Sequence, residues 1–294
     1  MAWRLYTLGL PPLEPREGFP QGAEPEGFFP LEAPWQARTA PPVPWPEPLY
    51  FLDGRERAEA LVAQGRRLAL LGCVAAGAVV FSGGRMRLLS PVVRRVGVGL
   101  EEALRVGELL YEPVPPAGEG LEGLQEGLGQ ARAALEEEVA RGLAEGLLVV
   151  DGPVRFTRPG PVLGYIKTHW ARYLPQAEEA LLPALGPGER TPAFRVRRRG
   201  LELASWYLRL PLPPEGARPP QAGLLRVETP LSGDFRALAD LSLALFPALA
   251  SHPVKDPRAP QNLLPVGGLE RELSRRMGSP EVVGRILARH LGGG

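Results

Sequence analysis

Short apolar runs that end at glycine or proline alternate along this chain with longer stretches where leucine, alanine and glutamate recur at helical spacing. Apolar runs bounded by turn residues are typical of buried strands, whereas a period of about 3.6 residues is typical of amphipathic helices. The alternation of the two patterns predicts an α/β fold with a mixed sheet flanked by helices. The sequence contains no heptad run, internal repeat or phosphate-binding glycine motif.

The predicted sheet begins with three antiparallel strands. The first covers residues 49–52 and ends at Asp53-Gly54, and a glycine turn at residues 82–84 joins the next two, at 67–81 and 86–98. The other predicted strands cover residues 147–150, 161–167, 193–199, 202–210 and 223–228, and the predicted helices cover residues 120–145, 170–185, 234–250 and 268–291.

Residues 1–47 differ from the rest of the chain, because they contain eleven prolines. That density of proline excludes a regular core element. Scattered aromatic residues distinguish the segment from a plain linker. We therefore expect an extended arm at 1–47 and a folded domain at 48–294, with the arm packed either on its own domain or on a partner subunit.

Composition narrows the class of protein. The chain is 44% hydrophobic with a net charge of +1, which is typical of a globular protein and disfavours one that simply coats nucleic acid. A single cysteine, Cys73, excludes an internal disulfide and a thiolate zinc cage. The longest apolar run is too short to span a membrane and no export signal is apparent, so a cytoplasmic protein is expected.

Rare residue types mark candidate chemistry. The chain has 34 basic residues but only two lysines, only five aspartates, and a single asparagine. The scarcity of asparagine, methionine and cysteine fits a GC-rich genome and a thermophile. A residue type that the chain otherwise avoids is more often kept at a position where its chemistry is needed.

Asp53 and Asp151 occupy matching contexts, each following four apolar residues and preceding a glycine. Open α/β sheets place their sites where buried strands end. If the two strands are neighbours, the carboxylates converge, and hard oxygen ligands at close range suit Mn²⁺ or Mg²⁺. The alternative is that each Asp-Gly pair only starts a turn.

A third ligand is expected from the helix at 120–145. Stepping 100° per residue places Glu136 at the edge of the apolar stripe, whereas Glu137 and Glu138 point elsewhere. Glu136 is therefore the glutamate predicted to face the sheet. A solvated helix face is the alternative.

Lys167 and Glu228 both close apolar strands. A lysine in an arginine-rich chain indicates a compact charge beside a phosphate or a metal site. Glu228 is a candidate ligand or a partner for Lys167. A structural ion pair explains either residue equally well.

The loop at 251–262 combines several rare residues. His252, Lys255 and Arg258 are candidate phosphate contacts, and Gln261 and Asn262 could orient water or a nucleotide; proline-rigidified packing is the alternative. Strand alternation places Arg195, Arg197 and Arg199 on one face as a candidate DNA-binding stripe, against a default of solvated surface.

Several short motifs occur in a fixed order between about residues 48 and 270. They are Leu52-Asp53-Gly54-Arg55, Arg132 with Glu136, Val149-Val150-Asp151-Gly152-Pro153, Val162-Leu163-Gly164-Tyr165-Ile166-Lys167 and Arg226-Val227-Glu228-Thr229-Pro230.

This ordered set resembles the NurA family of nucleases. The resemblance implies an RNase H-like core at 48–294 and manganese-dependent exonuclease activity of 5′–3′ polarity, with single-strand endonuclease activity. It also implies a homodimer that works with a hexameric HerA-type ATPase translocase on double-strand-break ends. Asp53, Glu136 and Asp151 match the family's acidic metal ligands, and Arg55 adds a basic side chain for DNA.

One motif departs from the family pattern. The family tends to have Tyr-Pro followed by Ala-His, whereas here His252-Pro253 is followed by Ala259-Pro260-Gln261. Either Gln261 or His252 takes over the role of the missing histidine, or activity is altered. The rival functions are a catalytically degenerate DNA-binding or clamp subunit that regulates an ATPase, and an RNA nuclease on the same fold.

Overall fold

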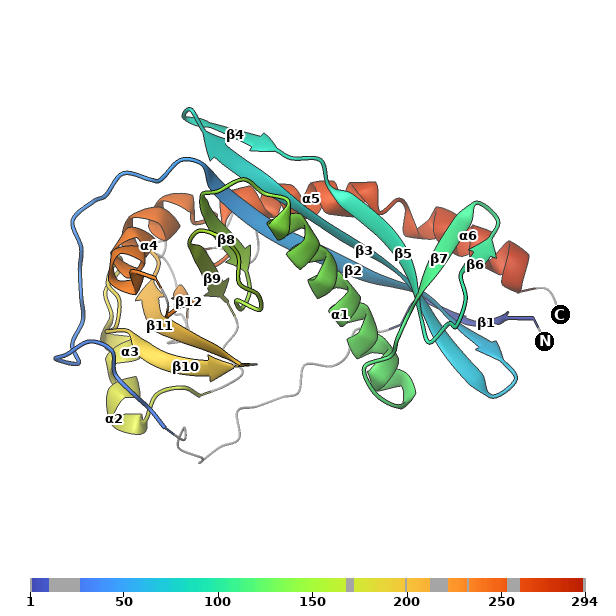
Figure 1. Ribbon diagram of the computed structural model, residues 1–294, viewed down its shortest axis with the longest axis horizontal. Coiled ribbons are helices and arrows are strands. Elements are labelled where there is room, and N and C mark those ends of the chain that lie inside the picture. The colour runs from blue at the N-terminus through green and yellow to red at the C-terminus, as the bar shows by residue number, and fades with distance from the viewer. Residues whose placement is uncertain are drawn as a thin grey trace.

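The computed structural model describes residues 2–10, 27–167, 172–198, 200–211, 222–231, 233–252 and 260–292. Within them a single 12-stranded sheet runs through the molecule in the order β10-β11-β12-β9-β8-β2-β3-β5-β7-β6, with β1 paired to β2 and β4 paired to β3 (Figure 1). The strands are β1 (Arg4–Leu8), β2 (Leu49–Gln64), β3 (Arg67–Ser82), β4 (Arg85–Leu88), β5 (Val92–Val98), β6 (Leu104–Val106), β7 (Leu109–Val114), β8 (Leu147–Asp151), β9 (Val162–Ile166), β10 (Phe194–Arg198), β11 (Leu201–Arg209) and β12 (Leu224–Pro230).

The centre of the sheet has the strand order expected for an RNase H-like core. Strands β2, β3 and β5 are antiparallel neighbours, and β8 and β9 follow on the other side of β2, parallel to it. This confirms the mixed α/β sheet predicted from the sequence.

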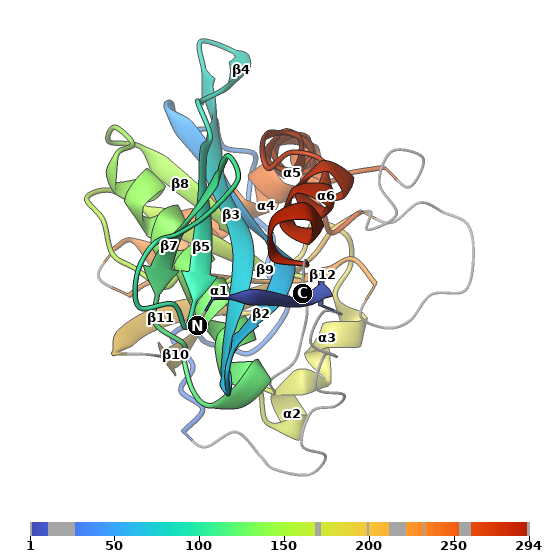
Figure 2. The same cartoon turned by 90° about the vertical axis from the view of Figure 1, so that its right-hand side faces the viewer.

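Helices cover both faces of the sheet. They are α1 (Gly120–Arg141), α2 (Gln176–Glu179), α3 (Leu181–Ala184), α4 (Phe235–Leu249), α5 (Leu264–Arg276) and α6 (Pro280–Leu291). Helices α5 and α6 lie on one side of the long strands and α1 on the other (Figure 2). None of the described helices is long and apolar enough to cross a membrane.

The strand predicted to end at Asp53 does not end there. β2 continues to Gln64 and forms a long hairpin with β3. The strand was not predicted beyond Asp53, because the charged residues at 55–59 obscure the alternation of apolar and polar positions. One of them, Glu59, is buried and accepts hydrogen bonds from Tyr111 Oη (2.6 Å) and Arg57 Nη2 (2.9 Å). Such satisfied polar groups can lie inside a sheet without unpaired charge.

The strand expected at 86–98 is two strands, β4 and β5, and the predicted strands did not include β6 and β7.

Other elements differ from prediction as well. The helix expected at 268–291 is two helices, because Gly278 has a φ of 81° and Pro280 starts α6. The helix expected at 170–185 is, in its described part, only the two short helices α2 and α3. The arm contains a strand, β1, which precedes the prolines and pairs with β2.

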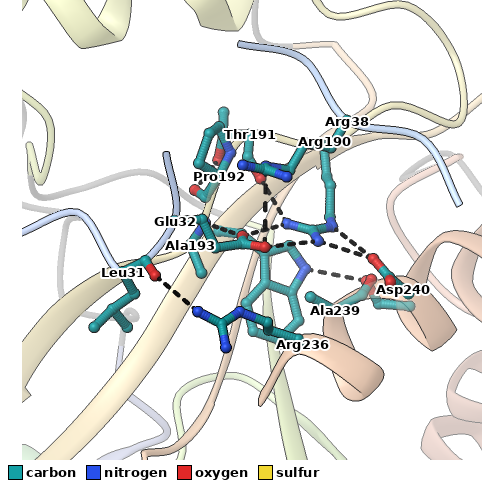
Figure 3. A network of polar contacts seen from close by, with 12 residues as sticks. Leu31, Glu32, Arg38, Arg190, Thr191, Pro192, Ala193, Arg236, Ala239 and Asp240 are labelled. Carbon is teal, nitrogen blue, oxygen red and sulfur yellow. Dashed lines mark hydrogen bonds and ion pairs between the residues drawn. The ribbon is translucent and has the colours of Figure 1, made fainter. Parts of the chain in front are cut away.

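The described part of the arm after residue 26 packs on its own chain. Glu32 is buried and receives hydrogen bonds from Arg190 Nη1 (2.7 Å) and from the backbone N–H of Ala193 (2.6 Å), while Arg190 Nη2 also donates to Asp240 (2.8 Å; Figure 3). Trp35 adds a hydrogen bond from Nε1 to Glu178 O (3.1 Å). Of the two alternatives, packing on its own domain is what the structure shows for this segment.

Candidate metal centre

Three carboxylates converge at one point of the sheet. Asp53 lies on β2, Asp151 is the last residue of β8, and Glu270 lies on α5. Each offers an oxygen, and the three oxygens lie within 4.8 Å of one another. The predicted convergence of Asp53 and Asp151 is therefore observed.

The local fold explains this convergence. Leu52 pairs with Val150 in the parallel β2–β8 ladder, so the residues that follow them, Asp53 and Asp151, sit side by side. On the other side Asp53 pairs with Gly77 of β3. A Cβ at Gly77 would lie 3.2 Å from Leu269 Cδ1, so the missing side chain lets α5 approach closely on the face that carries Asp53.

The electrostatics of Asp53 favour a bound cation. Its side chain is buried, and its Oδ2 atom has no hydrogen-bond partner among the described residues. Burial, and then the charges of Asp151 and Glu270, raise the pKa of Asp53 to about 8. A divalent cation would offset both the burial and the repulsion, and three carboxylate oxygens are the donor set that Mn²⁺ and Mg²⁺ prefer. The residues present therefore fit the metal that the resemblance implies.

Lys167 lies directly beside this group. Its Nζ atom donates to Asp151 Oδ2 (2.5 Å) and to Asn262 Oδ1 (3.2 Å), and it stands 5.4 Å from the ring centroid of Tyr165. Burial, followed by the charge of Asp151, raises the pKa of the Tyr165 hydroxyl well above its usual value. Tyr165 therefore stays neutral, and it is a neighbour of the site that sequence reasoning did not single out.

Glu136 faces inward as predicted. It is buried, whereas Glu138 is exposed and pairs with Arg94. The Glu136 carboxylate is ion-paired with Arg132 and packs on Gly54, where a Cβ would meet it at 2.3 Å. Glu136 thus flanks Asp53 without belonging to the group of three, and its role as a ligand remains a prediction.

The third carboxylate of the group is Glu270, which sequence reasoning missed. It lies in the run Leu269-Glu270-Arg271-Glu272, which resembles an ordinary solvated helix face. The sequence places Glu270 far from both aspartates, and only the packing of α5 on β2 and β3 brings it to them.

Glu228 is not an ion-pair partner of Lys167. It is fully buried, accepts hydrogen bonds from the Val154 N–H (2.8 Å) and Arg226 Nη1 (2.6 Å), and is also ion-paired with Arg198. The structural ion pair considered as the alternative is therefore what the structure shows. The predicted pairing with Lys167 is wrong, because Lys167 pairs with Asp151.

The other residues predicted to contact DNA or water do not belong to the group of three carboxylates. Gln261 donates to Leu224 O (3.2 Å), Asn262 is fully buried, and His252 is exposed. Arg55 is exposed on β2, Arg195 stacks on the Phe29 ring (4.3 Å) and Arg197 pairs with Glu202 (2.8 Å). Arg199, Lys255 and Arg258 lie outside the described residues.

Fold and site together define an α/β protein with a candidate divalent-cation centre formed inside β2, at the end of β8 and on α5. The NurA domain matches residues 71–266, about two thirds of the chain, so the chain belongs to the NurA family. No curated protein matches the sequence.

Comparison of structures agrees on the fold. The crystal structure of the NurA nuclease from Sulfolobus solfataricus aligns with a TM-score of 0.52 at 13% identity, over 87% of this chain and 88% of its own. The endonuclease V from Bacillus subtilis aligns with a TM-score of 0.34 at 13% identity, over 78% of this chain and 80% of its own. The second likeness is too distant to bear on fold or function.

Proposed function

We propose that this protein is a DNA nuclease that depends on Mn²⁺ or Mg²⁺. The observation that carries the proposal is Asp53: a buried carboxylate, close to Asp151 and Glu270, with one oxygen that no described residue hydrogen-bonds. Carboxylates arranged in this way repel one another, and a bound cation would offset that repulsion. Membership of the NurA family supports the assignment to nucleases.

The chain's own residues suggest how the reaction is organised. Asp53, Asp151 and Glu270 would hold the cation, with Glu136 as a fourth carboxylate beside them. A divalent cation supplies Lewis acidity to phosphodiester hydrolysis. Lys167, fixed beside Asp151, would neutralise charge that develops on the phosphate.

DNA would contact basic side chains at two places, one beside Asp53 and one on the edge strand β10, four strands from β8 in the sheet. Arg55 lies two residues beyond Asp53 on β2, and Arg195 and Arg197 line a surface hollow of about 370 Å³ together with Phe28 and Tyr173. Arginine with aromatic side chains is a combination that binds single-stranded nucleic acid. His252, Arg199, Lys255 and Arg258 are proposed as further phosphate contacts.

The finer description follows the family resemblance. We propose 5′–3′ exonuclease and single-strand endonuclease activity on double-strand-break ends, by a homodimer acting with a hexameric HerA-type ATPase. The alternative remains a catalytically degenerate subunit that binds DNA and regulates the ATPase, because the histidine of the last family motif is missing.

The test is cleavage of end-labelled DNA by the wild type and Asp53→Asn, with Mn²⁺, Mg²⁺ or EDTA. We expect metal-dependent cleavage by the wild type and a loss of about 100-fold or more in the variant, because a metal ligand is removed. Asp234→Asn is the matched control, since Asp234 caps α4 and is not one of the three carboxylates, and asparagine also caps helices.

Other substrates in the same assay distinguish the alternative functions. Labels at the 5′ or 3′ end report polarity, and RNA substrates test the RNA nuclease reading. Absence of cleavage with every metal, also after a HerA-type ATPase is added, would overturn the nuclease proposal in favour of the degenerate subunit.

A further inference from the structure

Asn262 stands between the two charged side chains that flank the aspartates. It is fully buried and is the only asparagine in the chain. Lys167 Nζ donates to its Oδ1 atom (3.2 Å), and its Nδ2 atom donates to Glu270 Oε2 (3.4 Å). Because an ammonium can only donate and a carboxylate only accepts, these partners fix which way the amide points.

The backbone holds this amide in place. Ser251 N donates to Asn262 O (2.9 Å), and the neighbouring residues Ala250 and Leu263 form a β-bridge. Leu263 is the N-cap of α5, so Asn262 is tied to the start of the helix that carries Glu270. The amide and Glu270 therefore share one rigid support.

Asparagine suits this position for an electrostatic reason. Its amide accepts from a cation on one side and donates to a carboxylate on the other without adding charge to a crowded acidic site. We propose that Asn262 is a positioning residue, which aims Glu270 at Asp53 and Asp151 and aims Lys167 at Asp151. This inference rests on the proposed metal centre and replaces the DNA contact predicted for Asn262, whose side chain is buried.

The test measures Mn²⁺ affinity of the full chain without DNA, from the free Mn²⁺ signal in electron paramagnetic resonance. Partners that orient metal ligands typically contribute 10–100-fold to affinity. We expect Asn262→Ala to weaken binding by about 10–100-fold. Asn262→Leu, which keeps most of the buried volume, should do the same and decides the matter if the alanine variant is unfolded.

Two comparisons separate positioning from a general structural effect. Ser251→Ala removes a buried hydroxyl with no partner among the described residues, next to the same bridge, and should leave Mn²⁺ affinity unchanged. In a Glu270→Gln background, Asn262→Ala should weaken binding much less than in the wild type, because the two residues act together. Additive losses would overturn the proposal.

The outcomes for the metal centre and for Asn262 are distinct. If the wild type fails to bind Mn²⁺, the proposed metal centre is wrong and the inference falls with it. If the wild type binds Mn²⁺ and the folded Asn262 variants bind it equally well, only the inference about Asn262 is wrong.

Discussion

At the scale of single residues, Gly54 is constrained by a side chain from another element. A Cβ at Gly54 would lie 2.3 Å from Glu136 Oε1 and 2.8 Å from its Cγ. The clash is with the end of a side chain, but Arg132 holds that carboxylate by an ion pair. The glycine after Asp53, which the sequence explains as a turn, is in fact a strand residue that makes room for Glu136.

Gly54→Ala is therefore a way to displace Glu136 without changing its chemistry. If Glu136 contributes to the metal centre, we expect Gly54→Ala to weaken Mn²⁺ binding by about tenfold, and Glu136→Gln to have a similar effect. Isothermal titration of both variants with Mn²⁺ measures this. If both variants bind Mn²⁺ with wild-type affinity, Glu136 does not contribute to the metal centre.

Gly72→Ala is the matched control. A Cβ at Gly72 would also crowd α1, but at Leu128 Cδ1 (2.6 Å), an apolar side chain. This variant should lower thermal stability through overpacking and leave Mn²⁺ affinity as it is.

At the scale of elements, the site depends on how α5 lies over the sheet. The helix packs on β2 and β3, with Leu269 and Leu273 over Gly77. Residues two apart on a helix point about 200° apart, so of the two glutamates in this run only Glu270 faces the aspartates. Glu272 instead pairs with Arg275 (2.6 Å) and Arg276 (2.8 Å).

Glu270→Gln and Glu272→Gln form a matched pair on one helix. The first should weaken Mn²⁺ binding by about tenfold or more, because ligand charge sets affinity for hard cations. The second should not change it. The free Mn²⁺ signal of the two variants under identical conditions gives the answer, and equal affinities would exclude Glu270 as a ligand.

At the scale of the whole molecule, the ion pairs drawn in Figure 3 hold the N-terminal arm against the domain. Glu32 of the arm meets Arg190, which precedes β10, and Arg190 meets Asp240 on α4. Burial alone would raise the pKa of Glu32, but the hydrogen bonds from Arg190 and Ala193 outweigh it and lower the pKa overall. The ionised form is therefore the one that the fold stabilises.

Glu32→Ala should lower the free energy of unfolding by about 1–3 kcal/mol at pH 7, because the Ala193 N–H loses its buried acceptor and Arg190 keeps only Asp240 as a carboxylate partner. A lowered pKa in the folded state means that this contribution is present above the unfolded pKa and fades as pH falls through the folded one. Urea unfolding followed by circular dichroism at pH 7 and at acidic pH measures both effects.

The exposed pair of Arg197 and Glu202 supplies the comparison. Glu202→Ala should change the unfolding free energy by less than about 1 kcal/mol, as exposed ion pairs usually do. If Glu32→Ala lowers the free energy of unfolding as little as Glu202→Ala does, these ion pairs do not hold the arm in place.

Some of this architecture is determined by the sequence alone. Strand periodicity and turn residues predicted the α/β sheet and the place of Asp151, and helical periodicity predicted that Glu136 turns inward. These properties depend on residues close together in the chain, so local patterns reveal them.

Only the tertiary structure decided the rest. Glu270 reaches the aspartates because α5 crosses the sheet at Gly77, and Asn262, just before α5, contacts Glu270 and Lys167. β2 continues past Asp53 because Arg95, Arg132 and Tyr111 from other elements pair with its glutamates. Glu228 belongs to a buried ion-pair network because Arg198 of β10 and the backbone at Val154, after β8, lie against its carboxylate beside Arg226 of the same strand. Each outcome depends on which remote elements pack together, and no pattern of neighbouring residues encodes that choice.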